Sequence, residues 1–141
     1  MRRNSRGFSL IEVLVAITIL TVGILVVSQM VVTGIQINAE EHQRMYARVV
    51  MARMFDYLTS LPYDHAFLED IDSDPNDLDD WTSSADFTST YTDSVANFSY
   101  LIRWNVADNT PEANIKTVRV HTLWGPDYKK KLTTNLLKLM L

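Results

Sequence analysis

The sequence predicts an α+β fold, a ladle in which one long N-terminal helix packs on a small antiparallel β-sheet. Three observations predict this fold. No Asp, Glu, Lys, Arg or His occurs from Val13 to Ala39, so this stretch is expected to form an apolar helix. An amphipathic helical pattern then continues to Leu61, and the last third of the chain alternates apolar and polar residues as strands do. The 141 residues leave room beyond the apolar segment for one small globular domain.

The N-terminus combines a basic leader with a segment of membrane-spanning length. Residues 1–7 contain Arg2, Arg3 and Arg6. As a helix, positions 13 to 39 would extend roughly 40 Å, which exceeds the thickness of a hydrocarbon core of about 30 Å. We therefore expect a transmembrane span over about residues 8–37. Positive charge before the span predicts that the N-terminus stays in the cytoplasm and that the rest of the chain is translocated.

A secretory signal peptide is the alternative explanation, because it also begins with basic residues and an apolar run. Its apolar region should be about 7–15 residues long and should end at a small-x-small cleavage site. Here the apolar run continues past Val27 to Ile37, and residues 32–34 and 37–39 make poor cleavage sites. The sequence favours a span that stays attached to the chain.

Beyond Ala39 the helical pattern becomes amphipathic. Apolar residues at three- and four-residue spacing form one broad stripe, made of Met45, Val49, Ala52 and Phe55 and flanked by Tyr46, Val50, Met54 and Leu58. Pro62 cannot continue a helix and disfavours helical geometry in the residue before it. We therefore expect one helix over residues 8–61 and a globular domain over residues 62–141.

The globular part divides into an acidic connection and a set of strands. Residues 62–94 lack periodicity and are rich in Asp, Ser, Thr and Asn, which predicts a long, exposed loop with at most a short turn or strand near 87–91. Apolar residues alternate over 98–106 and 118–124, and a third strand is expected within 131–140. Three strands joined by short turns predict an antiparallel meander whose apolar face packs on the amphipathic half of the helix.

One carboxylate, Glu12, lies near the start of the apolar stretch. An acidic residue at the centre of a membrane helix costs about 2.5–3.5 kcal/mol on insertion scales, so such residues usually have a function and a partner. Cleavage after Gly7 would create the amine of Phe8, a positive charge one helical turn from Glu12. The expected partner is this amine on an adjacent subunit. The alternative is that Glu12 merely lies at headgroup depth in a single-pass anchor.

The stretch from Arg6 to Val13, RGFSLIEV, resembles the class III signal of type IV pilins and type II secretion pseudopilins. The resemblance implies that a prepilin peptidase cleaves between Gly7 and Phe8 and methylates the new N-terminus at Phe8, and that Glu12 acts in assembly. It implies three kinds of partner: other pilin or pseudopilin subunits, the prepilin peptidase and an inner-membrane assembly platform. It also implies a single-pass protein of the inner membrane, with a periplasmic C-terminal domain, that later enters a pilus or pseudopilus filament.

Two departures from the family pattern favour a minor subunit. Major pilins usually carry a proline where this chain has Gln29, and they commonly close their C-terminal region with a disulfide, whereas this chain has no cysteine. The strands around Trp104 and Trp124 are similar in arrangement to those of PilV-type minor pilins. A minor pseudopilin of a type II secretion system is the alternative. A third hypothesis, of another class, is an adhesion module displayed at a pilus tip through the acidic loop.

Composition and motifs argue against other functions. The formal charge of −4 would become −7 without the leader, so nucleic acid is not an expected partner. The histidines, His42, His65 and His121, lie far apart in the sequence, and no nucleophile or phosphate-binding motif is present. We therefore expect no enzyme activity, no catalytic residues, no metal site and no cofactor.

The acidic run over residues 69–80 resembles a calcium-binding loop only in part. Asp70, Asp72 and Asp74 have the spacing of the first three EF-hand ligands. Pro75 stands at the sixth position, where glycine is needed, and Trp81 stands at the twelfth, where a bidentate glutamate is needed. The run is not an EF-hand. A solvated acidic loop is the favoured interpretation, and a looser calcium site stays open.

Overall fold

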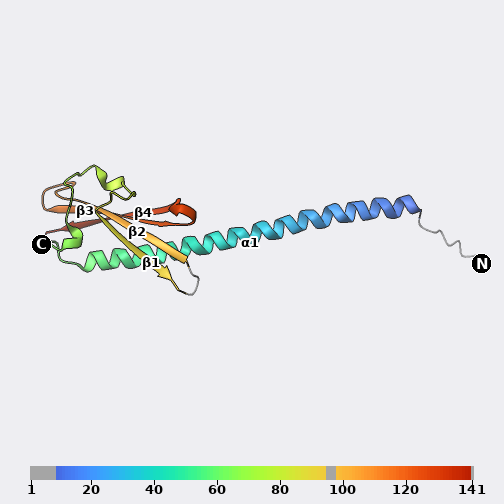
Figure 1. Ribbon diagram of the computed structural model, residues 1–141, viewed down its shortest axis with the longest axis horizontal. Coiled ribbons are helices and arrows are strands. Elements are labelled where there is room, and N and C mark those ends of the chain that lie inside the picture. Colours follow the sequence, from blue (N-terminus) through green and yellow to red (C-terminus); the bar gives the residue numbers. More distant parts are fainter. Residues whose placement is uncertain (1–8, 95–97, 141) are drawn as a thin grey trace, which may run out of the picture. The chain divides into compact units, whose positions relative to one another are not determined.

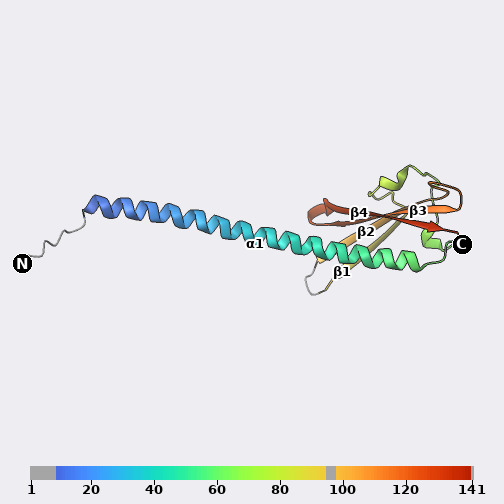
Figure 2. The ribbon, with the colours of Figure 1, turned by 180° about the vertical axis from the view of Figure 1, so that it is seen from behind.

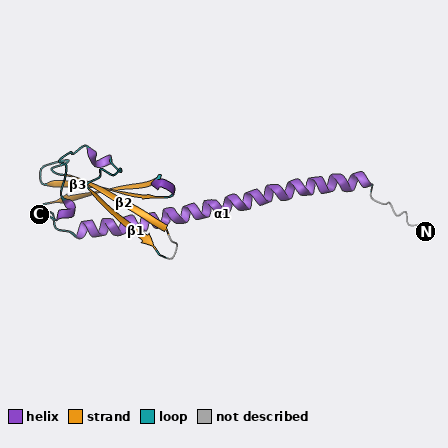
Figure 3. Ribbon diagram, in the orientation of Figure 1, coloured by secondary structure: helices purple, strands orange, loops and turns teal. Residues whose placement is uncertain are grey.

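The computed structural model describes residues 9–94 and 98–140 and confirms the α+β fold class. The chain forms one long helix and a four-stranded sheet. Figure 1 shows both, and Figure 3 colours helix and strands differently. The elements are α1 (Leu10–Ser60), β1 (Phe87–Asp93), β2 (Phe98–Ala107), β3 (Ile115–Trp124) and β4 (Lys130–Leu139), with short 3-10 helices η1 (Ala66–Leu68), η2 (Asp77–Asp79) and η3 (Pro126–Tyr128).

Helix α1 contributes to two compact units of the chain, Met1–His42 and Gln43–Leu141. The first unit contains the apolar part of the helix, and the second contains its last turns together with the sheet. The helix ends at Ser60: the Leu61 amide donates to the Leu58 carbonyl at 3.4 Å, and Pro62 follows. Each unit is described separately below.

The sheet is an antiparallel meander with strand order β1-β2-β3-β4. Cross-strand pairs such as Trp104 with Val120 and Val118 with Leu136 place apolar residues of β2, β3 and β4 on one face. Strand β1 adds a fourth member to the three strands predicted with regular alternation. It is an edge strand whose side chains are largely exposed, so it needs few apolar residues and gives a weak sequence signal.

The core of the second unit lies between the last turns of α1 and this face of the sheet. Its buried members are Ala47, Val50, Leu58, Leu68, Tyr100, Ile102, Trp104, Val106, Val118, Val120, Trp124 and Leu136. The helical stripe is rotated from the predicted one. Ala47, Val50 and Leu58 are buried and Met54 and Phe55 pack against the core, whereas Met45 and Val49 are exposed. The sheet contacts only one side of a helix that has apolar residues on two sides.

Trp104 makes both ring contacts and a hydrogen bond within this core. Its ring stacks on Phe87, with centroids 5.1 Å apart and planes 14° from parallel, and meets the edge of Phe67 at 6.2 Å. Its indole N–H donates to the Phe67 carbonyl at 2.9 Å. Trp104 therefore joins β2 to β1 and to the segment that follows α1. Trp104 and Trp124 are both core residues, 3% and 4% exposed.

The opposite face of the sheet is covered by the segment around η2, as Figures 1 and 2 show from two sides. The Asn105 amide donates to the carbonyls of Asp77 and Asp80 at 2.7 and 2.6 Å. The same side chain accepts from the Asp86 amide at 3.0 Å. Leu78 of η2 is buried in the same segment, at 9% exposure. The region predicted as an exposed loop is thus partly fixed to the sheet, because its carbonyls are bonded by polar side chains.

His121 on β3 bonds the same segment. It is fully buried, with Nε2 3.0 Å from the Leu78 carbonyl and Nδ1 2.9 Å from the Thr133 hydroxyl. Burial lowers the pKa of His121 below its usual value, and the hydrogen bond to Leu78 opposes that shift. The positive charges of Lys131 and Arg119 lower it further. The ring is therefore neutral where it bonds the loop.

We expect His121→Gln to reduce the pH dependence of folding stability. The unfolded chain gains a proton on this histidine near pH 6.5, and the folded chain gains it only at lower pH. The stabilisation by neutral His121 is therefore present above pH 6.5 and is lost as the pH falls through the lowered pKa. The difference in unfolding free energy between wild type and variant, measured in urea, should shrink from pH 7.5 to pH 5.5. A constant difference would contradict this assignment.

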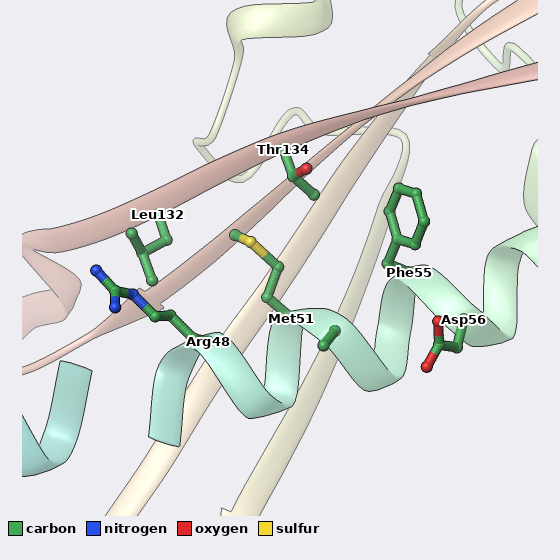
Figure 4. Close-up of a pocket in the computed structure, with 7 residues that line it drawn as sticks. Arg48, Met51, Phe55, Asp56, Leu132 and Thr134 are labelled. Atoms are coloured by element: carbon green, nitrogen blue, oxygen red, sulfur yellow. The ribbon is translucent and has the colours of Figure 1, made fainter. Parts of the chain in front are cut away.

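An open groove lies between α1 and the edge strand β4 (Figure 4). Figure 4 shows Met51 and Phe55 of the helix opposite Leu132 and Thr134 of the strand. The chain thus leaves a shallow apolar gap along the side of its core, where the helix meets the last strand.

The candidate assembly site at the start of the helix

Of the three predicted site residues, only Glu12 belongs to the described part of the structure. Gly7 and Phe8, the expected cleavage and methylation positions, lie outside the described residues. Glu12 is described and lies in the first turn of α1. The Ser9 carbonyl accepts from the amides of Glu12 and Val13, at 3.0 and 3.2 Å, so the helical hydrogen bonding begins at Ser9. Glu12 is therefore held on a regular helix from the outset.

The side chains that follow Glu12 form an apolar helical surface. Leu10, Ile11 and Val13 are 81%, 70% and 45% exposed, and large apolar residues as far as Ile37 are exposed to a similar degree. Helix α1 is long and apolar enough to cross a membrane, by length and composition, and none of its most apolar window is buried within the structure. So much exposed apolar surface needs an apolar environment, either lipid or other helices.

Hydroxyl groups within this surface are bonded to the helix itself. Thr18, Thr21 and Ser28 each donate to the carbonyl four residues earlier, all at 2.8 Å. In an apolar environment a polar group without a partner is costly, and these internal bonds remove that cost. Threonine and serine within an otherwise apolar helix are the sequence signal for this arrangement. Glu12 is thus the one residue in the described part of the segment, up to Ala39, that carries a formal charge.

The position of Glu12 determines how much free energy its burial in an apolar environment would cost. A carboxylate in the first turn is stabilised by the helix N-terminus, by about 0.3–1 kcal/mol at an exposed site. Moving it into an apolar interior costs about 2.5–3.5 kcal/mol on insertion scales. The helix alone therefore offsets only a fraction of that cost. At a water-accessible interface Glu12 needs no partner, whereas between apolar helices it needs a positive charge.

Comparison with known proteins adds one finding, at the same place in the chain. Residues 2–28 match the family model described as the prokaryotic N-terminal methylation motif. No curated protein and no solved structure matches the chain significantly.

The matched range contains the leader, Gly7, Phe8, Glu12 and the first half of the apolar run. The motif and the apolar helix fit a membrane-anchored subunit that later joins a filament. Proteins with this motif are processed by a prepilin peptidase and assemble with other pilin subunits. The match covers residues 2–28 of the 141-residue chain and supports a likeness to type IV pilin-like proteins, whose members are structural subunits.

Proposed function

We propose that this chain is a minor type IV pilin, a structural or priming subunit of a pilus assembled from the inner membrane. The observation that carries the proposal is the lone carboxylate of Glu12 at the start of an apolar, exposed helix within a methylation motif. A globular domain on the same chain supports it, since a subunit needs one part that enters the filament and one that it displays.

The proposed processing converts a membrane anchor into an assembly unit. The prepilin peptidase hydrolyses the peptide bond between Gly7 and Phe8 on the cytoplasmic side, which releases residues 1–7. The neutral amine of Phe8 then takes one methyl group from a sulfonium donor, which leaves as its thioether. The methylated amine is positively charged. The subunit waits in the bilayer with its C-terminal domain in the periplasm until the assembly platform transfers it into the filament.

Glu12 then gives the subunit its axial position. Within the apolar interior of a filament, the carboxylate is compensated by the Phe8 amine of an adjacent subunit. A buried polar contact of this kind fixes register, because any other axial offset leaves both charges without a partner. The back-bonded hydroxyls of Thr18, Thr21 and Ser28 do not compete for this charge.

Two departures from the usual pattern of major pilins support the minor role. Gln29 stands where major pilins usually have proline, and α1 runs through this position without interruption. The sequence has no cysteine, so the disulfide common in major pilins cannot form. The four-stranded meander instead closes its core by packing of β4 and Leu136 on the helix.

Intact mass spectrometry of the chain extracted from membranes tests the proposal. We expect a mature protein that begins at Phe8 and carries one added methyl group. The control is the same chain produced in cells without a prepilin peptidase, which should keep residues 1–7. Retention of the leader in the presence of the peptidase, or cleavage near Ala39, would contradict the proposal. Recovery of the mature chain in sheared pili, and not in a secretion pseudopilus, distinguishes the proposed role from that of a minor pseudopilin.

A further inference from the structure

The turn between β3 and β4 lies at the end of the second unit where α1 enters it. This unit begins at Gln43, within the helix. Strand β4 runs beside the helix in the same direction: Leu132 lies opposite Arg48, as Figure 4 shows, and the Lys138 ammonium donates to the Thr59 carbonyl at 2.6 Å. The start of β4, and the turn before it, therefore lie next to the first helical turns of the unit.

A short stretch of helix ties this end of the unit to the expected membrane span. The span is expected over residues 8–37, and the second unit begins at Gln43. Helix α1 is unbroken between them, so six residues rise about 9 Å. The Debye length at physiological salt is about 8 Å. Charges at this end of the unit are thus held within about one Debye length of the lipid headgroups.

The turn carries three consecutive lysines, at residues 129–131. The Lys129 side chain is 78% exposed, and its ion pair with Asp127, at 3.6 Å, is open to solvent on both sides. Exposed ion pairs are weak, so Lys129 can exchange this partner for another anion. Lys131 is exposed as well, and Tyr128 is 37% exposed. Tyrosine and lysine are residues that membrane proteins commonly place at the level of the headgroups.

The unit as a whole is acidic, in contrast to this turn. Residues 43–141 contain 10 basic and 14 acidic side chains. Part of the acidic run lies toward the other end of the sheet, where Asp70 accepts from the amide of Asp108, the residue after β2. A negatively charged surface therefore attracts the turn and repels the far end. The other charged residues at the near end of the unit, or just before it, are Glu40, Glu41, Arg44, Arg48 and Asp93.

We propose that, in the membrane-anchored subunit, the basic turn of residues 125–131 docks on the phosphate groups of anionic phospholipids. An ammonium group binds phosphate as a point charge and needs no shaped pocket, which suits an exposed turn. Basic residues beside a membrane segment are attracted to anionic lipids, and each lysine or arginine adds to the attraction. The docking rests on the membrane anchor proposed above and orients the globular unit while the subunit waits in the bilayer.

Chemical labelling of lysines in lipid nanodiscs tests the docking. The full-length chain is reconstituted at one copy per disc, in phosphatidylcholine with or without phosphatidylglycerol, and brief acetylation is followed by peptide mass spectrometry. We expect the acetylation rates of Lys129 and Lys131 to fall about fivefold in the anionic discs, the shift that corresponds to the attraction of one lysine to such a surface. NaCl at about 1 M should remove the difference, because the Debye length falls to about 3 Å. Lys138, at the far end of β4, should react equally in both discs.

A separate measurement distinguishes failure of the docking from failure of the anchor. Alkaline carbonate extraction of the chain from phosphatidylcholine vesicles shows whether α1 is inserted. A chain that is extracted lacks the anchor, which overturns the docking together with the proposed membrane stage. An inserted chain whose Lys129 and Lys131 react equally in both discs overturns the docking alone. Equal protection of Lys138 would also overturn it, because surface charge would then act on the whole unit and not on the turn.

Two matched variants test whether the turn itself makes the contact. Lys129→Gln and Lys138→Gln each remove one positive charge and keep a side chain that can donate a hydrogen bond. Folding should not depend on Lys129, because its side chain is 78% exposed. With Lys131 as the reporter, we expect Lys129→Gln to reduce the protection by anionic lipid and Lys138→Gln to retain it. Equal protection of Lys131 in the two variants, or equal loss, would contradict the assignment.

Discussion

Replacing Glu12 with Gln is expected to lower the recovery of the chain in filaments by more than about a hundredfold, with membrane insertion unchanged. Glutamine has the shape of glutamate but no charge. Removing one partner of a buried ion pair leaves the other uncompensated, at a cost of about 3–5 kcal/mol, and each 1.4 kcal/mol is about tenfold. Insertion requires only the apolar surface from Val13 onward, which the variant retains.

The measurement compares the chain in the sheared filament fraction with the chain in the membrane fraction, by quantitative immunoblotting. Intact mass must first show that Glu12→Gln is still cleaved before Phe8 and methylated there. Glu12→Asp is the matched control, because it keeps the charge on a side chain one methylene shorter, and it should retain more incorporation than Gln. If Glu12→Gln enters filaments at the wild-type level, the carboxylate is only an interfacial residue of the anchor.

The second large effect is expected at Trp104, where Ala should lower the unfolding free energy by about 3–5 kcal/mol, the range for removal of a buried aromatic side chain. Trp104 is 3% exposed, stacks on Phe87 and bonds the Phe67 carbonyl, so its removal leaves a cavity and a carbonyl without a partner. Small domains have a total stability of about 5–15 kcal/mol, so the variant would lose much of its margin.

Urea unfolding of the full-length chain, followed by far-ultraviolet circular dichroism, checks this value. Trp81→Ala is the matched control, because it removes the same side chain from a site that is 41% exposed. Trp81 lies near the Lys131 ammonium, 5.2 Å from its ring centroid, and an exposed contact of this type contributes about 0.5–1 kcal/mol. Equal losses at the two tryptophans would show that β2 is not the centre of the core.

Periodicity in the sequence predicted the helix and strand that bury one face against the core. The apolar run, Pro62 and the alternation around Trp104 identify α1, its end and strand β2, because each reflects a local rule. The exact face of α1 was missed, since both Val49 and Val50 lie within a broad apolar stripe and only contact with the sheet selects Val50. The sequence signal for strand β1 was weak, because an edge strand buries few of its side chains.

Long-range contacts account for what the sequence could not show. Asn105 and His121 alternate with the apolar residues of β2 and β3, yet both are fully buried against the η2 segment. Asp86 lies outside the acidic run, and only folding brings it to Asp70 and Asp72. The candidate assembly site is the opposite case. Gly7, Phe8 and Glu12 lie in a local motif, so the sequence alone is enough to propose this site.

The role of β4 in the core also determines when the domain can fold. The Lys138 ammonium donates to the Thr59 carbonyl at 2.6 Å, and Leu136 packs in the same core as Val50 and Leu58. The helix is synthesised first, but the strand that completes its core comes last among the described elements. Contacts this distant in sequence slow folding, because the intervening chain must be ordered before they form. Until β4 has been synthesised, the sheet is incomplete, and the core surface that Leu136 covers stays exposed.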